Sequence, residues 1–283
     1  MSTRSNPIAV FDSGLGGLTV VRQLMRRLPA ESIVYFGDTA RVPYGIKSAE
    51  TVTRFAEENI EFLEAFAPKL IIAACNTASA TALPRLDGKY TVPLCGVVQP
   101  GARAAVRKTR NRRVGVIGTE ATVGSSSYTR CITELNPDVR VVARACPLLV
   151  PLVEEGRTSG DPVVRMVLKE YLKPLKDARV DTVVLACTHY PLLKPGIRAV
   201  MGPGVQIVDS ARETARDAAD ILAASGRLAR ANTKAVHRFF ASDHPERFAK
   251  LGKRFLGRPL GAVRLVQPEL LNGHLALRVA EQG

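Results

Sequence analysis

Two cysteines occupy matching positions in the two halves of the sequence. Each follows an apolar run that ends in Ala and precedes small polar residues, in Ala74-Cys75-Asn76-Thr77 and in Ala186-Cys187-Thr188-His189. A cysteine pKa of about 8.5 makes both thiol and thiolate accessible near neutral pH. A thiolate on one face of a carbon and a thiol on the other could invert that carbon by proton transfer. Either cysteine alone could be a small core residue, but the matched pair favours chemistry.

The segments around these cysteines predict an α/β fold. Apolar runs rich in Ile and Val alternate with stretches in which apolar residues recur at helical spacing. Strands are expected at residues 8–11, 33–36, 70–74, 92–98, 114–117, 139–143, 182–186 and 205–208. This alternation predicts mostly parallel sheets with helices on both faces. Ligands bind beyond the carboxyl ends of such strands, where both cysteines would stand.

The order of segments restarts half-way along the chain, which indicates two similar domains. Phe11 and Ile117 lie 106 residues apart, and Cys75 and Cys187 lie 112 apart, so a duplication with an insertion of about six residues fits. A strand at 235–241 and a helix at 245–255 are expected to return to the first unit. The predicted domains are residues 1–98 plus 210–283, and residues 99–209, with the active site in the cleft between them.

Composition limits the class of protein. The chain has 283 residues, and its 46% apolar content suits a packed core. The apolar runs are too short for a membrane span, and the polar start leaves no room for a signal peptide, so a soluble cytoplasmic protein is expected. Five irregularly spaced cysteines and four histidines favour neither a disulfide framework nor a metal site. Cys95, Cys131 and Cys146 are expected to be packing residues.

The formal charge of +14 raises the question of an anionic partner. It arises from 40 Lys and Arg against 26 Asp and Glu. Such a surface could attract nucleic acid or steer anionic substrates. Aromatic residues make up only 5%, and no nucleic-acid-binding motif is present. Net charge alone therefore keeps nucleic acid as an alternative partner, and a solvated basic face is the simpler interpretation.

Other enzyme classes fit the sequence less well. The turn Gly14-Leu15-Gly16-Gly17 is not a dinucleotide-binding motif, because Thr19 stands where the last glycine should be, and no P-loop follows. A Cys-His hydrolase would want a nucleophile on a glycine-flanked elbow, and it would leave Cys187 unexplained. No clear lysine joins a phosphate cradle, so pyridoxal phosphate is not expected. We predict that the enzyme uses no cofactor.

Four segments together resemble the glutamate racemase family, in the expected order and over nearly the whole chain. They are residues 11–20 (FDSGLGGLTV), 35–39 with 43–45 (YFGDT and PYG), 74–78 (ACNTA) and 186–191 (ACTHYP). The resemblance implies interconversion of L- and D-glutamate by two cysteines without a cofactor. It also implies a homodimer and a supply of D-glutamate for peptidoglycan synthesis. A racemase of aspartate or a related acid is the alternative.

The resemblance also implies roles for individual residues. Cys75 would take the α-proton of D-glutamate and Cys187 that of L-glutamate. Asp12 and His189 would assist these thiols. Supporting acids and substrate-binding residues would be Asp38, Glu154 (or Glu155 in the neighbouring register), Ser13, Tyr44, Gly45, Asn76, Thr77, Thr119, Thr122 and Thr188, with Asp12 and His189. Taken singly, the two aspartates could be caps, the histidine structural and the glutamate solvated.

Overall fold

The first of two sheets contains both ends of the described chain. A computed structural model describes residues 3–271 and 274–279. The strand order in this sheet is β11-β10-β9-β2-β1-β3-β4, and every neighbouring pair is parallel except β10 and β11. Its strands are β1 (Ile8–Asp12), β2 (Ile33–Gly37), β3 (Leu70–Ala73), β4 (Leu94–Gly96), β9 (His237–Ala241), β10 (Val263–Leu271) and β11 (His274–Val279).

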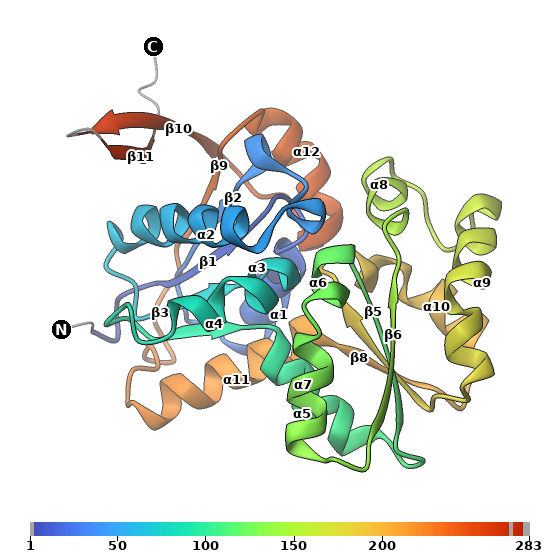
Figure 1. The fold of residues 1–283 in the computed structure, drawn as a ribbon. Helices are drawn as coiled ribbons and strands as arrows, with labels where there is room; N and C mark the ends of the chain where they lie inside the picture. The colour runs from blue at the N-terminus through green and yellow to red at the C-terminus, as the bar shows by residue number, and fades with distance from the viewer. Residues whose placement is uncertain (1–2, 272–273, 280–283) are drawn as a thin grey trace.

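The second sheet is wholly parallel and lies beside the first (Figure 1). Its order is β6-β5-β7-β8, with strands β5 (Arg113–Gly118), β6 (Arg140–Ala145), β7 (Thr182–Ala186) and β8 (Gln206–Asp209). Helices precede or follow nearly every strand of both sheets. The expected α/β class, with mostly parallel sheets flanked by helices, is confirmed.

Twelve α-helices and three short 3-10 helices connect the strands of the described chain. The α-helices are α1 (Leu18–Arg27), α2 (Ala49–Glu64), α3 (Asn76–Thr81), α4 (Leu83–Leu86), α5 (Val98–Lys108), α6 (Glu120–Gly124), α7 (Ser127–Leu135), α8 (Leu149–Glu154), α9 (Pro162–Asp177), α10 (Lys194–Met201), α11 (Ser210–Ala224) and α12 (Pro245–Leu256). The 3-10 helices are η1 (Thr39–Arg41), η2 (Tyr44–Ile46) and η3 (Tyr190–Leu193).

The central strands are apolar throughout because both faces of each sheet are covered. In β1, Ile8 and Val10 pack into one core cluster, while Ala9 and Phe11 pack into another. All four side chains are fully buried. The alternation follows from the two-residue period of a strand, and burial on both sides removes any polar stripe.

Several helices begin at a side chain that accepts a hydrogen bond from their first turn. Ser48 Oγ accepts from the Thr51 amide at 3.2 Å at the start of α2. Asp161 Oδ1 accepts from Val163 N at 2.8 Å before α9, and Asp209 caps α11 in the same way. Such caps accept hydrogen bonds from amides that have no partner inside the helix, so the capping residues determine where these helices begin.

The strand predicted at residues 92–98 is wrong in extent. Only Leu94–Gly96 forms β4, and Val98 already begins α5. Pro93 has no amide hydrogen to donate to a neighbouring strand. Beyond Gly96 the amides of Val97 and Val98 lie 3.0 and 3.3 Å from Ser79 Oγ, which turns the chain away from the sheet. Competition from this side-chain acceptor was not visible in the apolar pattern.

The tail of the chain adds to the first sheet. Strand β9 pairs in parallel with β2, and β10 pairs in parallel with β9. The predicted strand and helix of the tail therefore correspond to β9 and α12, whereas the pair β10 and β11 was not predicted. The chain leaves the first sheet through α5 and returns through α11, and these two helices pack together. The domain boundaries at residues 98 and 210 stay a prediction.

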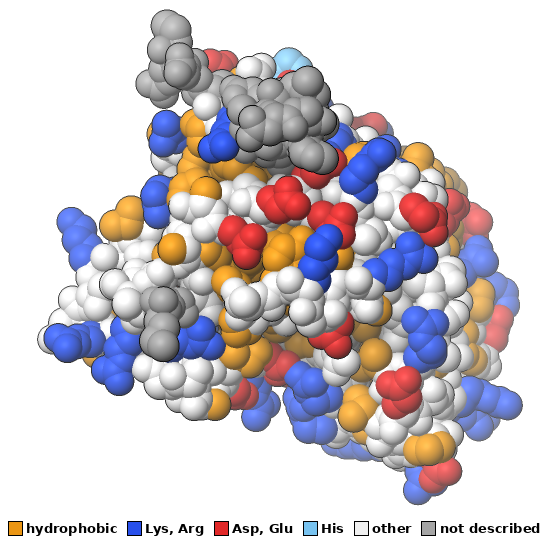
Figure 2. All heavy atoms as spheres, turned by 60° about the vertical axis from the view of Figure 1, so that its left-hand side comes forward, with side chains coloured by type: hydrophobic (Ala, Val, Ile, Leu, Met, Phe, Trp, Pro, Cys, Tyr) orange, Lys and Arg blue, Asp and Glu red, His pale blue; other side chains and the backbone are white. Residues whose placement is uncertain are grey.

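The surface carries charges of both signs. On the face shown in Figure 2, Lys and Arg side chains are scattered, and Asp and Glu side chains lie among them. A continuous basic track is not visible on that face. Of the helices in the described ranges, none combines the length and apolar character that crossing a membrane requires.

Candidate active site

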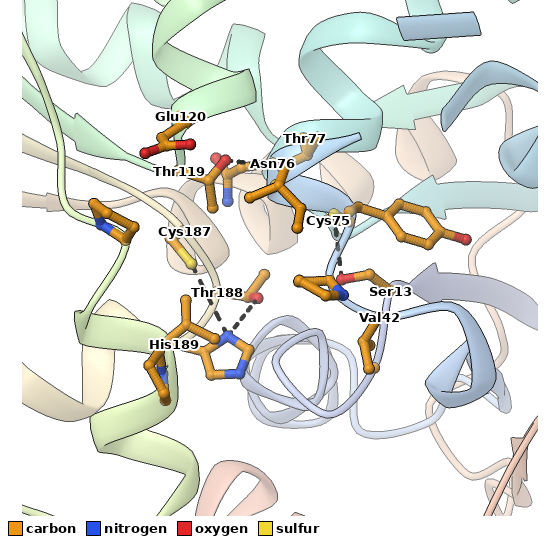
Figure 3. A pocket seen from close by; sticks show the side chains of 18 of the residues that line it. Ser13, Val42, Cys75, Asn76, Thr77, Thr119, Glu120, Cys187, Thr188 and His189 are labelled. Atoms are coloured by element: carbon orange, nitrogen blue, oxygen red, sulfur yellow. Dashed lines mark hydrogen bonds between the residues drawn. The ribbon is translucent and has the colours of Figure 1, made fainter. Parts of the chain in front are cut away.

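A cavity of about 370 Å³ contains both matched cysteines. Cys75 follows β3 and Cys187 follows β7, so each stands where a buried parallel strand ends. Figure 3 shows the two side chains approaching the cavity from opposite sides. The other lining residues are Ser13, Gly14, Val42, Pro43, Tyr44, Gly45, Ile46, Asn76, Thr77, Thr119, Glu120, Pro147, Val150, Pro151, Glu154, Thr188 and His189. Two opposed thiols around one small cavity can act on the two faces of one carbon.

Cys75 lies close to a hydroxyl group and a buried carboxyl group. Its Sγ lies 3.7 Å from Ser13 Oγ, and the Cys75 side chain is 6% exposed. Burial, together with the nearby Asp12 carboxyl group, raises the pKa of the Cys75 thiol to about 12. This thiol is therefore protonated at neutral pH and is suited to donate a proton.

Cys187 has a basic neighbour. Its Sγ lies 3.9 Å from His189 Nδ1, and His189 Nε2 lies 2.9 Å from Glu154 Oε1. Burial lowers the pKa of His189, but its contacts with Cys187 and Glu154 outweigh burial and raise that pKa to about 10. An imidazolium beside Cys187 places a positive charge next to its sulfur atom, which suits a proton-accepting role for this cysteine.

Polar side chains at two helix starts form a wall of the cavity. The hydroxyl oxygens of Thr77 and Thr119 are 3.0 Å apart, and Thr122 Oγ1 lies 3.2 and 2.9 Å from them. Asn76 Nδ2 is buried and has no hydrogen-bond partner among the described residues. Its carbonyl oxygen is engaged by Tyr128 OH at 2.7 Å. A buried donor without a partner at a cavity wall is suited to an acceptor on a ligand.

Three of the predicted residues lie behind the cavity wall. Asp12, Asp38 and Thr122 are buried but do not line the cavity. Asp12 accepts from the Gly14 amide at 3.1 Å, and burial raises the pKa of its carboxyl group. Asp38 accepts a hydrogen bond from the hydroxyl of Tyr44, which does line the cavity, so Asp38 contacts the cavity wall through that side chain. Thr122 holds the two threonines in front of it.

Every other predicted residue lines the cavity, and the choice between Glu154 and Glu155 is clear in space. Glu154 lies beside His189, whereas Glu155 is exposed and pairs with Arg157. Sequence reasoning missed Tyr128, whose hydroxyl fixes the Asn76 amide. It also missed the apolar lining from Val42, Ile46, Pro147, Val150 and Pro151. Only the spacing of Pro147, Val150 and Pro151 before Glu154, which suits one face of a helix, could have indicated part of that lining.

Position 16, in the turn after β1, requires glycine because this turn packs directly against the segment that contains Thr188 and His189. A Cβ on Gly16 would stand 2.0 Å from Thr188 Oγ1 and 2.7 Å from His189 Nδ1. Thr19 Oγ1 lies 3.1 Å from the carbonyl oxygen of Thr188 across the same contact. The glycine turn thus lets the first sheet approach the Cys187 segment closely.

The side chains of the described residues do not form a recognisable metal site. No group of three or more His, Cys, Asp or Glu side chains within residues 3–271 and 274–279 is arranged to hold a metal ion. Of the residues that line the cavity in the described chain, none is Lys or Arg. An anionic ligand would therefore be held by hydroxyl, amide and backbone N–H donors.

Comparisons with known proteins match this arrangement. The model of the family described as Asp/Glu/Hydantoin racemase matches residues 12–218. The chain belongs to this racemase family. A glutamate racemase of Geobacter metallireducens is 52% identical over 262 residues, covering 93% of this chain and 97% of that protein. The enzyme class expected from the motifs, an amino-acid racemase, is confirmed.

Solved structures of the family share the whole fold. Glutamate racemase isoform RacE1 from Bacillus anthracis matches with a TM-score of 0.90 and 41% identity, covering 93% of this chain and 98% of that one. The glutamate racemase from Francisella tularensis, solved in complex with D-glutamate, matches with a TM-score of 0.87 and 36% identity, over 93% and 98% of the two chains. The two-sheet architecture is therefore that of the racemase relatives.

Proposed function

We propose that this chain is a glutamate racemase that inverts Cα by proton transfer between Cys187 and Cys75. The observation that carries the proposal is the pair of opposed thiols in one cavity, each at the carboxyl end of a buried strand. The specificity for glutamate is supported by relatives named glutamate racemase, of which one was solved with D-glutamate.

In the direction from L- to D-glutamate, the Cys187 thiolate takes the α-proton. The electron pair left on Cα then takes a proton from the Cys75 thiol on the opposite face. The step leaves Cys187 as a thiol and Cys75 as a thiolate, which is the state needed for the reverse direction. No electron acceptor is needed, because one C–H bond breaks and one forms.

The difficulty of the reaction lies in the weak acidity of a carbon beside a carboxylate. Hydrogen bonds to the substrate carboxylate can stabilise the charge that develops on it. Asn76, Thr77 and Thr119 provide amide and hydroxyl groups at the cavity wall. Because these groups are preoriented by Tyr128 and Thr122, they need little rearrangement when the charge develops.

The test is α-proton exchange followed by NMR in D2O, with L- and D-glutamate offered separately. Wild type is expected to place solvent deuterium on Cα during racemisation of either enantiomer. Cys75→Ala and Cys187→Ala are each expected to lower kcat by about 10³-fold or more, since each removes a general acid or base. Cys131→Ala, outside the cavity, is the matched control and is expected to keep full activity.

Full racemisation by either active-site variant would contradict the two-thiol mechanism. L- and D-aspartate offered in the same assay decide the substrate class. Faster exchange with aspartate than with glutamate would replace the proposed substrate by the alternative. Dialysed enzyme that regains activity only with pyridoxal phosphate would contradict the prediction of a cofactor-independent reaction.

We further propose, on the family resemblance, that the product D-glutamate supplies peptidoglycan synthesis and that the enzyme is a cytoplasmic homodimer. Growth of a bacterium auxotrophic for D-glutamate, when it carries this gene, tests the first point. Light scattering of the purified protein tests the second. Growth only with added D-glutamate, or a monomeric mass, would contradict the respective proposal.

A further inference from the structure

Helix α12 makes a direct contact with α8, the helix that carries Glu154. Arg254 Nη1 donates a hydrogen bond of 3.1 Å to the carbonyl oxygen of Val153, the residue before Glu154. The Val153 carbonyl also accepts the Gly156 amide at 3.0 Å, and carbonyls in the last turn of a helix carry the negative end of its dipole. A guanidinium is therefore a well-matched partner for the end of α8.

The next residue of α12 contacts the other member of the acid–base pair. Phe255 is buried, and its ring meets the ring of His189 edge-on, with centroids 5.1 Å apart and an interplanar angle of 79°. Two consecutive residues of α12 thus contact His189 and the residue that precedes Glu154. Figure 1 shows α12 and α8 facing each other at the mouth of the gap between the two halves.

The chain after α8 leaves room for the guanidinium. Gly156 has a φ of +97°, a conformation that favours glycine, and a Cβ there would stand 3.2 Å from Arg254 Nη1. Glu154 itself is 42% exposed at its side chain, so packing alone holds it weakly. The contact with Arg254 fixes the backbone from which Glu154 reaches His189.

We propose that Arg254 is a positioning residue for the Glu154–His189 pair, and through it for the proton transfer at Cys187. This inference rests on the proposed function, because it assigns Arg254 to the thiol that acts on L-glutamate. The hydrogen bond to Val153 holds the end of α8, which keeps the Glu154 carboxylate within 2.9 Å of the imidazole.

The sign of a change in the His189 pKa separates positioning from simple charge. His189 is faced by Glu154 from α8, by Cys187 from the segment after β7 and by Asp12 from the end of β1. From α12 it is faced by the neutral ring of Phe255. Arg254 is a cation, so its removal would by charge alone raise the pKa of His189. Loss of the carboxylate partner would instead lower that pKa.

The experiment is an NMR titration of protein labelled with ¹³C at the histidine rings. The His189 signal is assigned by its absence in His189→Asn, among only four histidines. Arg254→Met keeps the aliphatic stem and removes the donor, and it is expected to lower the pKa of His189 by about one unit. Arg254→Lys keeps a cation and a donor and should restore most of the wild-type value. Lys253→Met, on the exposed neighbouring position, removes the same charge and should change nothing.

An unchanged or raised pKa of His189 in Arg254→Met would overturn the inference. In racemisation assays the same variant is expected to lower kcat by about fivefold while KM stays within about twofold, because Arg254 lies outside the cavity. A rise in KM with unchanged kcat would also contradict the role. If wild type exchanged no α-proton, the proposed function would fail, yet the titration would still decide whether Arg254 positions the pair.

Discussion

The two halves of the active site use similar backbone frames and opposite electrostatics. Around Cys75 the neighbours are the Ser13 hydroxyl and a buried carboxyl group, and the pKa of that thiol rises to about 12. Around Cys187 stands an imidazole whose pKa rises to about 10 because Glu154 and the thiol outweigh burial. Matching segments of the chain thus provide two thiols, and the groups beside these thiols differ in charge.

The difference between the two cysteines bears on the direction of the proposed reaction. The proposed reaction from L-glutamate starts with a thiol at Cys75 and a thiolate at Cys187, and burial favours the thiol at Cys75. Release of D-glutamate would leave the opposite form. The return to the first form requires a proton to move from Cys187 to Cys75, through solvent or through a reverse turnover. The following predictions test how far the two halves differ, from the largest expected effect to the smallest.

The strongest contrast is expected between His189→Asn and Ser13→Ala. His189→Asn removes the imidazolium beside Cys187 and should lower kcat by about 10²- to 10³-fold. Ser13→Ala removes a hydroxyl 3.7 Å from Cys75 and should lower kcat by about tenfold or less, since a contact of that length is weak. Steady-state racemisation by circular dichroism measures both. Equal losses would show that the two halves do not differ as described.

Gly16→Ala tests the contact between the halves. A Cβ at this position would strike Thr188 Oγ1 and His189 Nδ1, so the Cys187 side should shift. We expect kcat to fall by about 10²-fold, as is common when a catalytic group moves by about 1 Å. Gly124→Ala is the control, because nothing lies within 4 Å of a Cβ there. Activity of Gly16→Ala close to that of the control would mean that this contact does not set the site.

Tyr128→Phe tests the amide on the Cys75 side. Its hydroxyl lies 2.7 Å from Asn76 Oδ1, and without it the amide loses its fixed orientation. KM for both enantiomers should rise by about tenfold, because the proposed hydrogen bond from the Asn76 amide to the substrate carboxylate is weakened. The pH profile should stay unchanged. An altered pH profile would mean that Tyr128 affects a thiol rather than the substrate.

The last prediction concerns stability against pH. The pKa of His189 is about 10 in the folded chain and about 6.5 when unfolded, so its protonated form stabilises the fold. That contribution is complete below pH 6.5 and is lost as pH rises toward 10. The stability advantage of wild type over His189→Asn, on the order of 1 kcal/mol, should therefore shrink over this range. Urea unfolding at pH 6, 8 and 10 measures it, and an advantage that grew with pH would contradict the sign.

The strands and the two cysteines could be predicted from the sequence, whereas the residues that position them could not. Buried strands such as β1 and β7 are apolar on both faces, and the cysteines after them could be placed from that pattern alone. The short β4 could not, because Ser79 competes for the amides of Val97 and Val98 from a distant helix. Tyr128 and Arg254 were missed for the same reason, since each acts through a contact between segments far apart in the chain.

The path of the chain between the sheets has a mechanical consequence. The backbone crosses once before α5 and once before α11, so the unit built on β5 to β8 is attached at two neighbouring points. We expect a unit with two such attachments to swing about the line through them. Substrate entry by such a swing would widen the gap between the sulfur atoms and break contacts that cross it. Among them are the contacts of Gly16 and Thr19 with the Cys187 segment, those of Arg254 and Phe255 with Val153 and His189, and the hydrogen bonds of Thr77 with Thr119 and Thr122. The strength of these contacts would then set how often the gap opens.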